Sequence, residues 1–493
     1  MGGSSALNFM IYMRGTPLDY DEWAAQGNPG WKYRDVLPYF IKPEDNRNPE
    51  YVDPNYHGVG GYQTVGQFPF QDANVGLLIR AFRELGLEEF DMNAEDQIGT
   101  MLLQHTSRDG RRLTSNGAFI RAIRKKRPNL TIRTQAQVTR ILIDPKTKVA
   151  YGVEYLRDGK LQNAYATKEV IVSAGAIDAP KLLMLSGIGP AEQLKTLSIT
   201  VVEDLSVGYN LQDHVTIDGV VFSLTNLTAT TVTDEERRTD VEYYSNTSMG
   251  PLSATGPAQV NAMVQTKYAG SNRPDIQYLF DATMAADFYT DPVLAYQTGV
   301  LPLSYYDSLM VRSVLLYPRS RGVVMLNTSD PIFGAPLIYA NTFKEKVDLL
   351  TMVEGIKQSL NLLRTEALQS VGMSLVDNPL PACAQFTFAS DDYWACVAME
   401  YTTTIFHPVG TCKMGPRNDN NAVVDAKLRV HGIENLRVID ASIMPIIPRG
   451  NTNAPTLMIA EKGSDFIKEK WLETSNVDTS LFPYDVTENS YHK

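Results

Sequence analysis

This 493-residue sequence has no long apolar run, no excess of basic residues and only three cysteines. No apolar run is long enough to cross a bilayer, so the sequence predicts no membrane span. The chain has 45 Lys and Arg against 56 Asp and Glu, a net charge of −11, whereas a nucleic acid partner would require a basic face. Its three cysteines do not have the spacing of a zinc site, and we expect no metal centre.

A targeting pattern is also missing from the first residues. The start, MGGSSALNFMIYMRG, has no charged segment ahead of its short apolar patch, so it does not predict a signal peptide. Cys383 and Cys396 lie thirteen residues apart in one polar loop. Composition leaves open whether these two form a disulfide or whether all three thiols are reduced. With 43% apolar and 20% charged residues, the sequence is that of an ordinary globular protein.

The first half of the chain predicts an α/β arrangement. Four β-prone runs between residues 129 and 172, beginning with NLTIRTQ, are separated by turn residues and indicate an antiparallel meander. The last strand, Val170–Ser173, leads to a glycine turn at Gly175 and then to a helix with Pro180 in its first turn. Strand, glycine turn and helix form the arrangement with which α/β sheets present backbone groups to a nucleotide.

Residues 216–400 predict a second, α+β domain. A helix is expected from Lys344 to Leu363. The strand-like segments are VVFSL, DIQYLF and GVVMLNT.

After residue 400 the pattern returns to α/β. The segment LRVHGIENLRVID predicts a hairpin-like pair that ends at Asp440. A helix should begin at Pro455, because Asn and Thr residues before it offer caps and Pro favours the first turn. The tail from about residue 471 is polar, and we expect it to be loose.

Two segments carry candidate chemistry. In HPVGTCKMG, His407 is one of only six histidines, and Pro408 and Gly410 would hold its imidazole on a stiff turn. Such a ring is suited to accept a proton from a bound hydroxyl. The Asn-rich turn 450–456 precedes a helix, whose N-terminus would favour a group that is, or becomes, anionic. Each segment also has an ordinary interpretation, as a packed histidine and as a plain helix cap.

Together with other motifs, these segments resemble one family. HPVGTCKMG, NAVVDAKLRVHGIENLRVIDASIMP and GNTNAPTLMIAEKGSD are similar to the C-terminal signature region of the glucose–methanol–choline (GMC) flavoprotein oxidoreductases. GAIDAPKLLMLSGIGP resembles the second signature and departs from it at Ala179, where the pattern has Ser or Thr. GGSSALNFMIYMRG resembles the first signature, and VGYNLQDHV is also typical of the family. The resemblance spans residues 2 to about 468 and is strongest to the insect glucose-dehydrogenase-like branch.

The resemblance implies that the chain uses FAD and oxidises an alcohol or sugar to a carbonyl. His407 matches the family's catalytic base, which takes the hydroxyl proton as hydride leaves for the flavin. Asn451 matches the second active-site position, whose side chain would bond the substrate oxygen. Hydride leaves more easily from an alkoxide-like carbon, so a proton acceptor and a hydrogen-bond donor should meet at one oxygen. The resemblance also assigns cofactor contacts to nine residues: Gly3, Ser4, Asn8, Met10, Val138, Asp440, Ala441, Asn453 and Thr456.

The fold implied by the resemblance is a Rossmann-like α/β FAD-binding domain plus an α+β substrate domain with an antiparallel sheet. The family begins with a strand, a G-x-G-x-x-G turn and a helix, but this sequence contains no such motif. We therefore expect an FAD-binding domain that lacks its first βαβ unit, in a chain truncated at its N-terminus. The expected parts are a truncated FAD-binding region, a mainly substrate-binding domain, a return to the FAD domain with the catalytic motifs, and a polar tail: residues 1–215, 216–400, 401–470 and 471–493.

Three functions stay open at this point. We favour an FAD-dependent oxidoreductase acting on CH–OH groups. The alternatives are a hydroxynitrile-lyase-like relative without net redox change, and a truncated fragment that does not hold FAD. The electron acceptor, oxygen or a quinone, and the substrate are not readable. Insect-type members are usually secreted, so the resemblance implies an extracellular protein and favours the Cys383–Cys396 disulfide.

Overall fold

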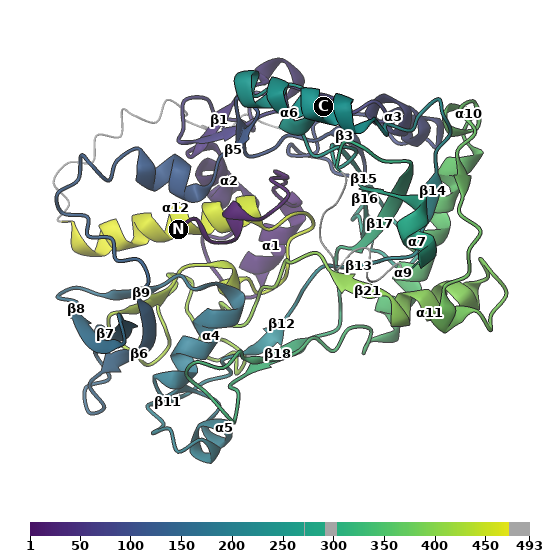
Figure 1. Cartoon of the computed structure of the whole chain (residues 1–493). Coiled ribbons are helices and arrows are strands. Elements are labelled where there is room, and N and C mark those ends of the chain that lie inside the picture. Colours follow the sequence, from purple (N-terminus) through teal and green to yellow (C-terminus); the bar gives the residue numbers. More distant parts are fainter. Residues whose placement is uncertain (271, 291–302, 473–493) are drawn as a thin grey trace, which may run out of the picture.

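The computed structural model describes residues 1–270, 272–290 and 303–472, so most of the predicted polar tail lies outside the described residues. Figure 1 shows two lobes, one built on a large sheet and the other on helices α4 (Gly175–Leu185) and α12 (Asn453–Trp471) with smaller sheets. Each lobe has its own apolar core. Within the described ranges, no helix is both long enough and apolar enough to cross a membrane.

The large sheet has eight strands, and every pair in it is antiparallel. Its order is β20–β14–β17–β16–β15–β3, and β13 pairs with both β17 and β21. The bounds are β3 (Gly99–Leu102), β13 (Val215–Ile217), β14 (Val221–Ser223), β15 (Val260–Val264), β16 (Ile276–Thr283), β17 (Ser308–Leu315), β20 (Ser374–Leu375) and β21 (Thr402–Thr404). The predicted antiparallel sheet is therefore present, and it includes strands from before residue 216 and after residue 400.

Helices cover the large sheet on the side of its main core. Helix α9 packs on β16 and β17, and α3 packs on β3 and β15. Strand β17 is buried along its whole length, as expected for a central strand covered on both faces. The bounds of the remaining helices are α1 (Pro17–Ala25), α2 (Tyr33–Ile41), α3 (Val75–Glu84), α5 (Ala191–Thr196), α6 (Asp234–Thr247), α7 (Ala285–Thr290), α9 (Lys346–Ser359), α10 (Glu366–Gln369) and α11 (Asp391–Glu400).

The predicted helix from Lys344 to Leu363 is close to what forms. Helix α9 ends at Ser359 and continues as the tighter 3₁₀ turn Leu360–Arg364. A 3₁₀ turn is a common way to end an α-helix, so the apolar pattern runs slightly past the α-helical part.

The predicted meander is formed by β6 (Gln137–Ile143), β7 (Ala150–Arg157) and β8 (Lys160–Tyr165). The first β-prone run, residues 129–135, was wrongly predicted as a strand. This run is exposed and has no strand partner among the described residues, so its β-propensity is not supported by packing. Strand β9 (Val170–Val172) follows the meander.

Strand β9 pairs in parallel with β22 (Leu436–Val438). This pairing joins the α/β segment before residue 216 to the one after residue 400. Of the predicted hairpin-like pair, only β22 is a regular strand, and Arg429 forms an isolated bridge with Arg437. The other short strands are β1 (Glu44–Asn46), β2 (Gln63–Val65), β4 (Ser107–Arg108), β5 (Arg111–Arg112), β10 (Ile188–Gly189), β11 (Glu203–Asp204), β12 (Tyr209–Leu211), β18 (Gly322–Met325) and β19 (Leu337–Tyr339).

Helix α4 begins at Gly175, earlier than predicted, so Pro180 lies inside the helix and not in its first turn. A proline at this position cannot donate to the carbonyl of Ala176, one turn earlier. The hydroxyl of Thr411 donates to that carbonyl over 2.6 Å. The segment after His407 thus satisfies a backbone group that the proline leaves open.

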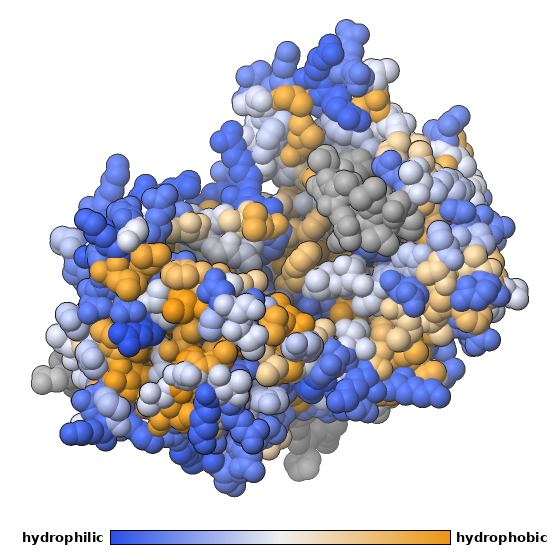
Figure 2. All heavy atoms as spheres, turned by 60° about the horizontal axis from the view of Figure 1, so that its bottom comes forward, coloured by the Kyte–Doolittle hydropathy of each residue, from blue (hydrophilic) through white to orange (hydrophobic). Residues whose placement is uncertain are grey.

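The structure contains the Cys383–Cys396 disulfide that composition left open. The two Cα atoms are 5.7 Å apart, and Cys396 lies on α11 while Cys383 lies in the 3₁₀ turn Pro381–Cys383. Cys412 is a free, buried thiol. Figure 2 shows the surface hollowed between the two lobes, with many hydrophobic residues on the lobe that carries α4, α12 and β6–β9.

Candidate active site

His407 lies on a constrained corner that follows β21. Phe406 has a φ of 64°, a conformation that a bulky residue rarely adopts. The backbone N–H of His407 donates to Oδ1 of Asp213 over 2.9 Å. Gly410 has a φ of 90°, and a Cβ there would lie 2.6 Å from the carbonyl oxygen of Asn210. The corner is therefore fixed on both sides of the imidazole.

A second histidine contacts the ring of His407. His214 lies immediately before β13, is fully buried, and has its Nδ1 3.0 Å from Nδ1 of His407. Its Nε2 is 3.1 Å from the carbonyl oxygen of Leu316. Burial lowers the pKa of His407 to about 4 and the pKa of His214 well below its usual value. Both rings are therefore neutral at pH 7.

Asn451 faces the other nitrogen of the His407 ring. Its Nδ2 is 3.4 Å from Nε2 of His407, and its buried Oδ1 accepts no hydrogen bond within the described chain. The loop with Asn451 is held by Arg449, whose guanidinium donates to Asp19 and, over 2.9 Å, to the carbonyl of Pro274. An unpaired buried polar atom beside a neutral imidazole is expected where a polar ligand binds.

Helix α12 begins at Asn453, two residues after Asn451. Its N-cap, Thr452, makes no side-chain cap hydrogen bond among the residues described. The first-turn N–H groups of this 19-residue helix are therefore available to a ligand oxygen. Asn453 is the first helical residue, and the Thr456 hydroxyl donates to the carbonyl of Thr452 over 2.8 Å.

Asp440 links the glycine turn to the catalytic segment. Its Oδ2 accepts the Gly175 N–H over 2.8 Å, and its Oδ1 accepts the Ser442 N–H over 2.8 Å. The carbonyl of Ala441 accepts the N–H of Gly410 over 3.3 Å. Burial raises the pKa of Asp440. The Asp440 carboxylate thus holds the glycine turn, and the backbone of the next residue, Ala441, holds the segment that follows His407.

The N-terminal segment is ordered by neighbouring chain segments. Gly3 and Ser4 lie in the 3₁₀ turn Gly3–Ala6, and Asn8 Oδ1 accepts hydrogen bonds from the Met10 N–H and from Arg112. The carbonyl of Met10 accepts the Thr106 N–H over 2.8 Å.

Val138 lies apart from the other predicted residues, on β6 in the meander, and 37% of its surface is exposed. The structure thus brings His407 and Asn451 together and places Asp440 beside the Gly175 turn. Which of the nine residues contact the cofactor stays a prediction.

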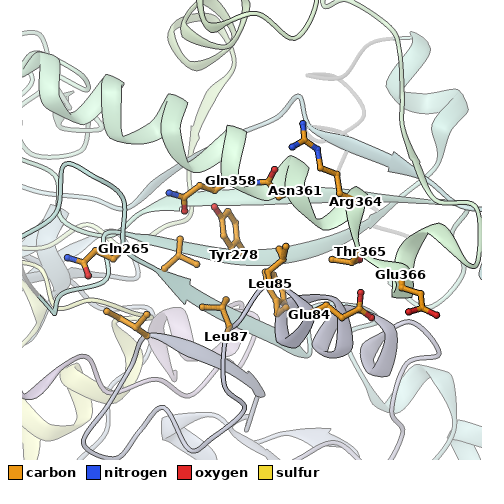
Figure 3. Close-up of a pocket in the computed structure, with 13 residues that line it drawn as sticks. Glu84, Leu85, Leu87, Gln265, Tyr278, Gln358, Asn361, Arg364, Thr365 and Glu366 are labelled. Carbon is orange, nitrogen blue, oxygen red and sulfur yellow. The ribbon is translucent and has the colours of Figure 1, made fainter.

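The sequence analysis missed His214 and Asp213. Both occur in VGYNLQDHV, which stood out as a typical segment, but nothing in the segment itself indicates a partner. A separate cleft of about 590 Å³ lies beside α3, β16 and the end of α9 (Figure 3). Tyr278, Gln358 and Arg364 help to line it, and none of the predicted site residues does.

Comparisons with known proteins agree with the motif pattern. Two family models described as GMC oxidoreductase match residues 1–216 and 318–460. The chain belongs to the GMC oxidoreductase family. It is 41% identical to the glucose dehydrogenase [FAD, quinone] of Drosophila melanogaster over 474 residues, which cover 96% of this chain and 74% of that protein.

Two further relatives show the breadth of the similarity. The ecdysone oxidase of Bombyx mori is 36% identical over 505 residues, covering 98% of this chain and 71% of that protein. A solved formate oxidase of Aspergillus oryzae superposes with a TM-score of 0.84 at 27% identity, covering 95% of this chain and 84% of that chain. The GMC family is therefore established, and its flavoenzyme members share the two-domain fold seen here.

The residues of this chain fit a bound FAD in two respects. The first turn of α12 offers uncapped N–H groups, and Oδ1 of Asn451 is unpaired within the described residues. Uncapped amides suit the electron-rich edge of a flavin, and a buried acceptor without a partner suits a polar group of a ligand.

Proposed function

We propose that this chain is an FAD-dependent oxidoreductase that converts the CH–OH group of an alcohol or sugar to a carbonyl. One observation supports the proposal most directly: His407 Nε2 and the side-chain nitrogen of Asn451 lie 3.4 Å apart. A neutral imidazole and an amide donor at one position can hold and deprotonate a single hydroxyl group.

Each of the two residues has a distinct role in this proposal. Nε2 of His407 accepts the hydroxyl proton, because its low pKa keeps the ring neutral at pH 7. The side-chain N–H of Asn451 donates to the same oxygen and stabilises the negative charge that develops on it. Arg449 keeps Asn451 in place through its ion pair with buried Asp19.

FAD, when bound, supplies the acceptor for the hydride that leaves the alcohol carbon. We propose that Asn453 and Thr456 lie near the flavin pyrimidine edge, where the start of α12 stabilises negative charge. The other residues proposed to hold FAD are Gly3, Ser4, Asn8, Met10, Val138, Asp440 and Ala441.

We also propose the finer division of the chain. Residues 1–215 and 401–470 would hold FAD, and residues 216–400 would mainly hold the substrate. The FAD-binding part would lack its first βαβ unit. The absence of G-x-G-x-x-G from the sequence supports this, as does the β9–β22 sheet, which has only those two strands in the described part of the chain. Weak FAD binding by the chain, with a Kd far above that of a complete family member in fluorescence titration, is expected, and tight binding would contradict it.

For the electron acceptor we propose a quinone, because glucose dehydrogenase [FAD, quinone] is 41% identical over most of the chain. Stopped-flow reoxidation of the reduced flavin should be much faster with a soluble quinone than with air-saturated buffer. Faster reoxidation by oxygen would instead indicate an oxidase.

We propose an extracellular location, and the Cys383–Cys396 disulfide supports it, because structural disulfides persist in oxidising compartments. Thiol titration of the natural protein after denaturation without reductant should give one thiol per chain, from Cys412. Three thiols per chain would argue against this location.

The decisive test is anaerobic bleaching of bound flavin by alcohols and sugars in the FAD-loaded chain. We expect reduction with a CH–OH donor and a loss of about 10²–10⁴-fold in its rate for His407→Ala, with flavin still bound. His431→Ala is a matched control, because the ring of this histidine contacts the carbonyl of Gly415, away from His407 and Asn451. No bleaching by any donor, or full activity of His407→Ala, would contradict the proposal.

A further inference from the structure

The two nitrogens of His214 have different partners, and this fixes where its proton lies. Nε2 is 3.1 Å from the carbonyl oxygen of Leu316, and a carbonyl can only accept a hydrogen bond. Nε2 must therefore carry the hydrogen. In a neutral ring, Nδ1 is then left with a free lone pair.

This lone pair determines the tautomer of His407. The two Nδ1 atoms are 3.0 Å apart, so one of them must donate to the other. Because Nδ1 of His214 has no hydrogen, Nδ1 of His407 must supply it. A neutral His407 then has its free lone pair on Nε2, the nitrogen that faces Asn451.

We propose that His214 is a positioning residue that holds His407 in the tautomer able to accept the substrate proton at Nε2. This inference rests on the role proposed above for His407. It adds a hydrogen-bonded relay from the Leu316 carbonyl through two imidazoles to the substrate oxygen. The same contact also fixes the plane of the His407 ring, since the rings meet edge to face at 77°.

The nearby carboxylate does not perform this task. Asp213 precedes His214 in the sequence, but its oxygens accept the backbone N–H of His407 and the hydroxyl of Thr404. It therefore holds the backbone of the corner and leaves the imidazole to His214. The partner of His407 is thus a neutral acceptor, in place of the carboxylate found in many catalytic triads.

Sheet pairing brings the two rings together. Val215 on β13 lies opposite Thr404 on β21, so the residues beyond these strand ends are neighbours. The N–H of Ile405 donates to the carbonyl of His214 over 3.2 Å, which extends the pairing by one step. Pairing of β13 with β17 also places His214 near Leu316. The relay is therefore built on the backbone of three strands.

Two substitutions separate the proposed role from simple packing. In His214→Asn, Oδ1 takes the position of Nδ1 and can still accept from His407, but the bond to Leu316 is lost. In His214→Gln, the amide nitrogen can still donate to Leu316 and more of the volume is filled, but no acceptor occupies the δ position. A packing role favours the Gln variant, whereas the proposal favours the Asn variant.

We expect His214→Asn to retain kcat within about 10-fold of the unsubstituted chain, and His214→Gln to lose about 10²-fold or more. KM and flavin content should change little, since neither variant alters the groups proposed to bind the substrate or FAD. Equal losses, or a Gln variant more active than the Asn variant, would overturn the proposal.

A second measurement does not depend on turnover. In the FAD-loaded chain with ¹⁵N-labelled histidine, NMR should show Nδ1 of His407 protonated and Nε2 unprotonated, with the signal assigned by its loss in His407→Ala. His214→Gln should yield a mixture of tautomers, while His214→Asn should keep one. A protonated Nε2 in the unsubstituted chain would refute the proposal, even if His407 proved to be the base. Full turnover of His407→Ala would instead refute the proposed function.

Discussion

The buried ion pair between Arg449 and Asp19 makes a sharp prediction about the active site. Both side chains are almost completely buried, and the Arg449 backbone N–H also donates to Asp19 over 2.8 Å. The guanidinium lies 4.1 Å from the ring centre of Tyr317 and donates to the carbonyl of Pro274. The residue that precedes Gly450 and Asn451 is thus tied to α1 and to one end of the β16–β17 pair, where β16 begins and β17 ends.

The expected cost of Arg449→Met follows from these contacts. The substitution removes a charge-assisted bond to Asp19, a bond to Pro274 and the ring contact, and it leaves the Asp19 carboxylate buried. Breaking a buried ion pair from one side costs about 3–5 kcal/mol. A displacement of Asn451 by about 1 Å would further reduce kcat by about 10²-fold.

Denaturant unfolding and steady-state kinetics would measure both effects. Adding Asp19→Asn removes the uncompensated charge, so the double variant should be no less stable than Arg449→Met, with a coupling of about 0.5–3 kcal/mol. Arg429→Met is the matched control, because its ion pair with Asp425 is largely exposed and should contribute less than about 1 kcal/mol. Stability and kcat within error of the original for Arg449→Met would refute the anchoring role.

Two other outcomes follow from the structure. The kcat/KM for an alcohol should be constant above about pH 5 and fall tenfold per pH unit below about pH 4. The neutral form of His407 is the base, and burial lowers its pKa to about 4. A decrease in kcat/KM that begins near pH 6.5 would contradict this. Replacing Cys383 and Cys396 by Ser should lower the free energy of unfolding by about 3 kcal/mol, since the bond closes a loop with a sequence separation of 13, whereas Cys412→Ser should not act through loop closure.

Local sequence patterns predicted much of the fold. The meander, the strand that becomes β9, the glycine turn and the helix after residue 450 all formed, because period, turn residues and caps act within a few residues. The predictions that failed concern segments whose structure depends on contacts with residues far away in the sequence. Residues 129–135 have β-propensity but pair with no strand in the part of the chain that the structure describes. Helix α4 could begin before Pro180 because the distant Thr411 hydroxyl donates to the carbonyl of Ala176.

The same distinction explains the site. His407 and Asn451 could be predicted because each lies in a motif whose turn chemistry is local. His214 could not be assigned, since its meaning depends on β13 lying between β17 and β21, a pairing that joins residues far apart in the chain.

A histidine's role is set by what its other nitrogen contacts. The sequence identifies the imidazole, but which of its two nitrogens carries the proton depends on a hydrogen-bond partner. In this chain the register of the sheet places that partner. In this chain the Leu316 carbonyl fixes His214, and His214 in turn fixes His407. The chemistry predicted for the motif HPVGTCKMG therefore depends on a backbone carbonyl at the end of β17. A substitution that shifts this strand end should alter the tautomer of His407 without touching either histidine.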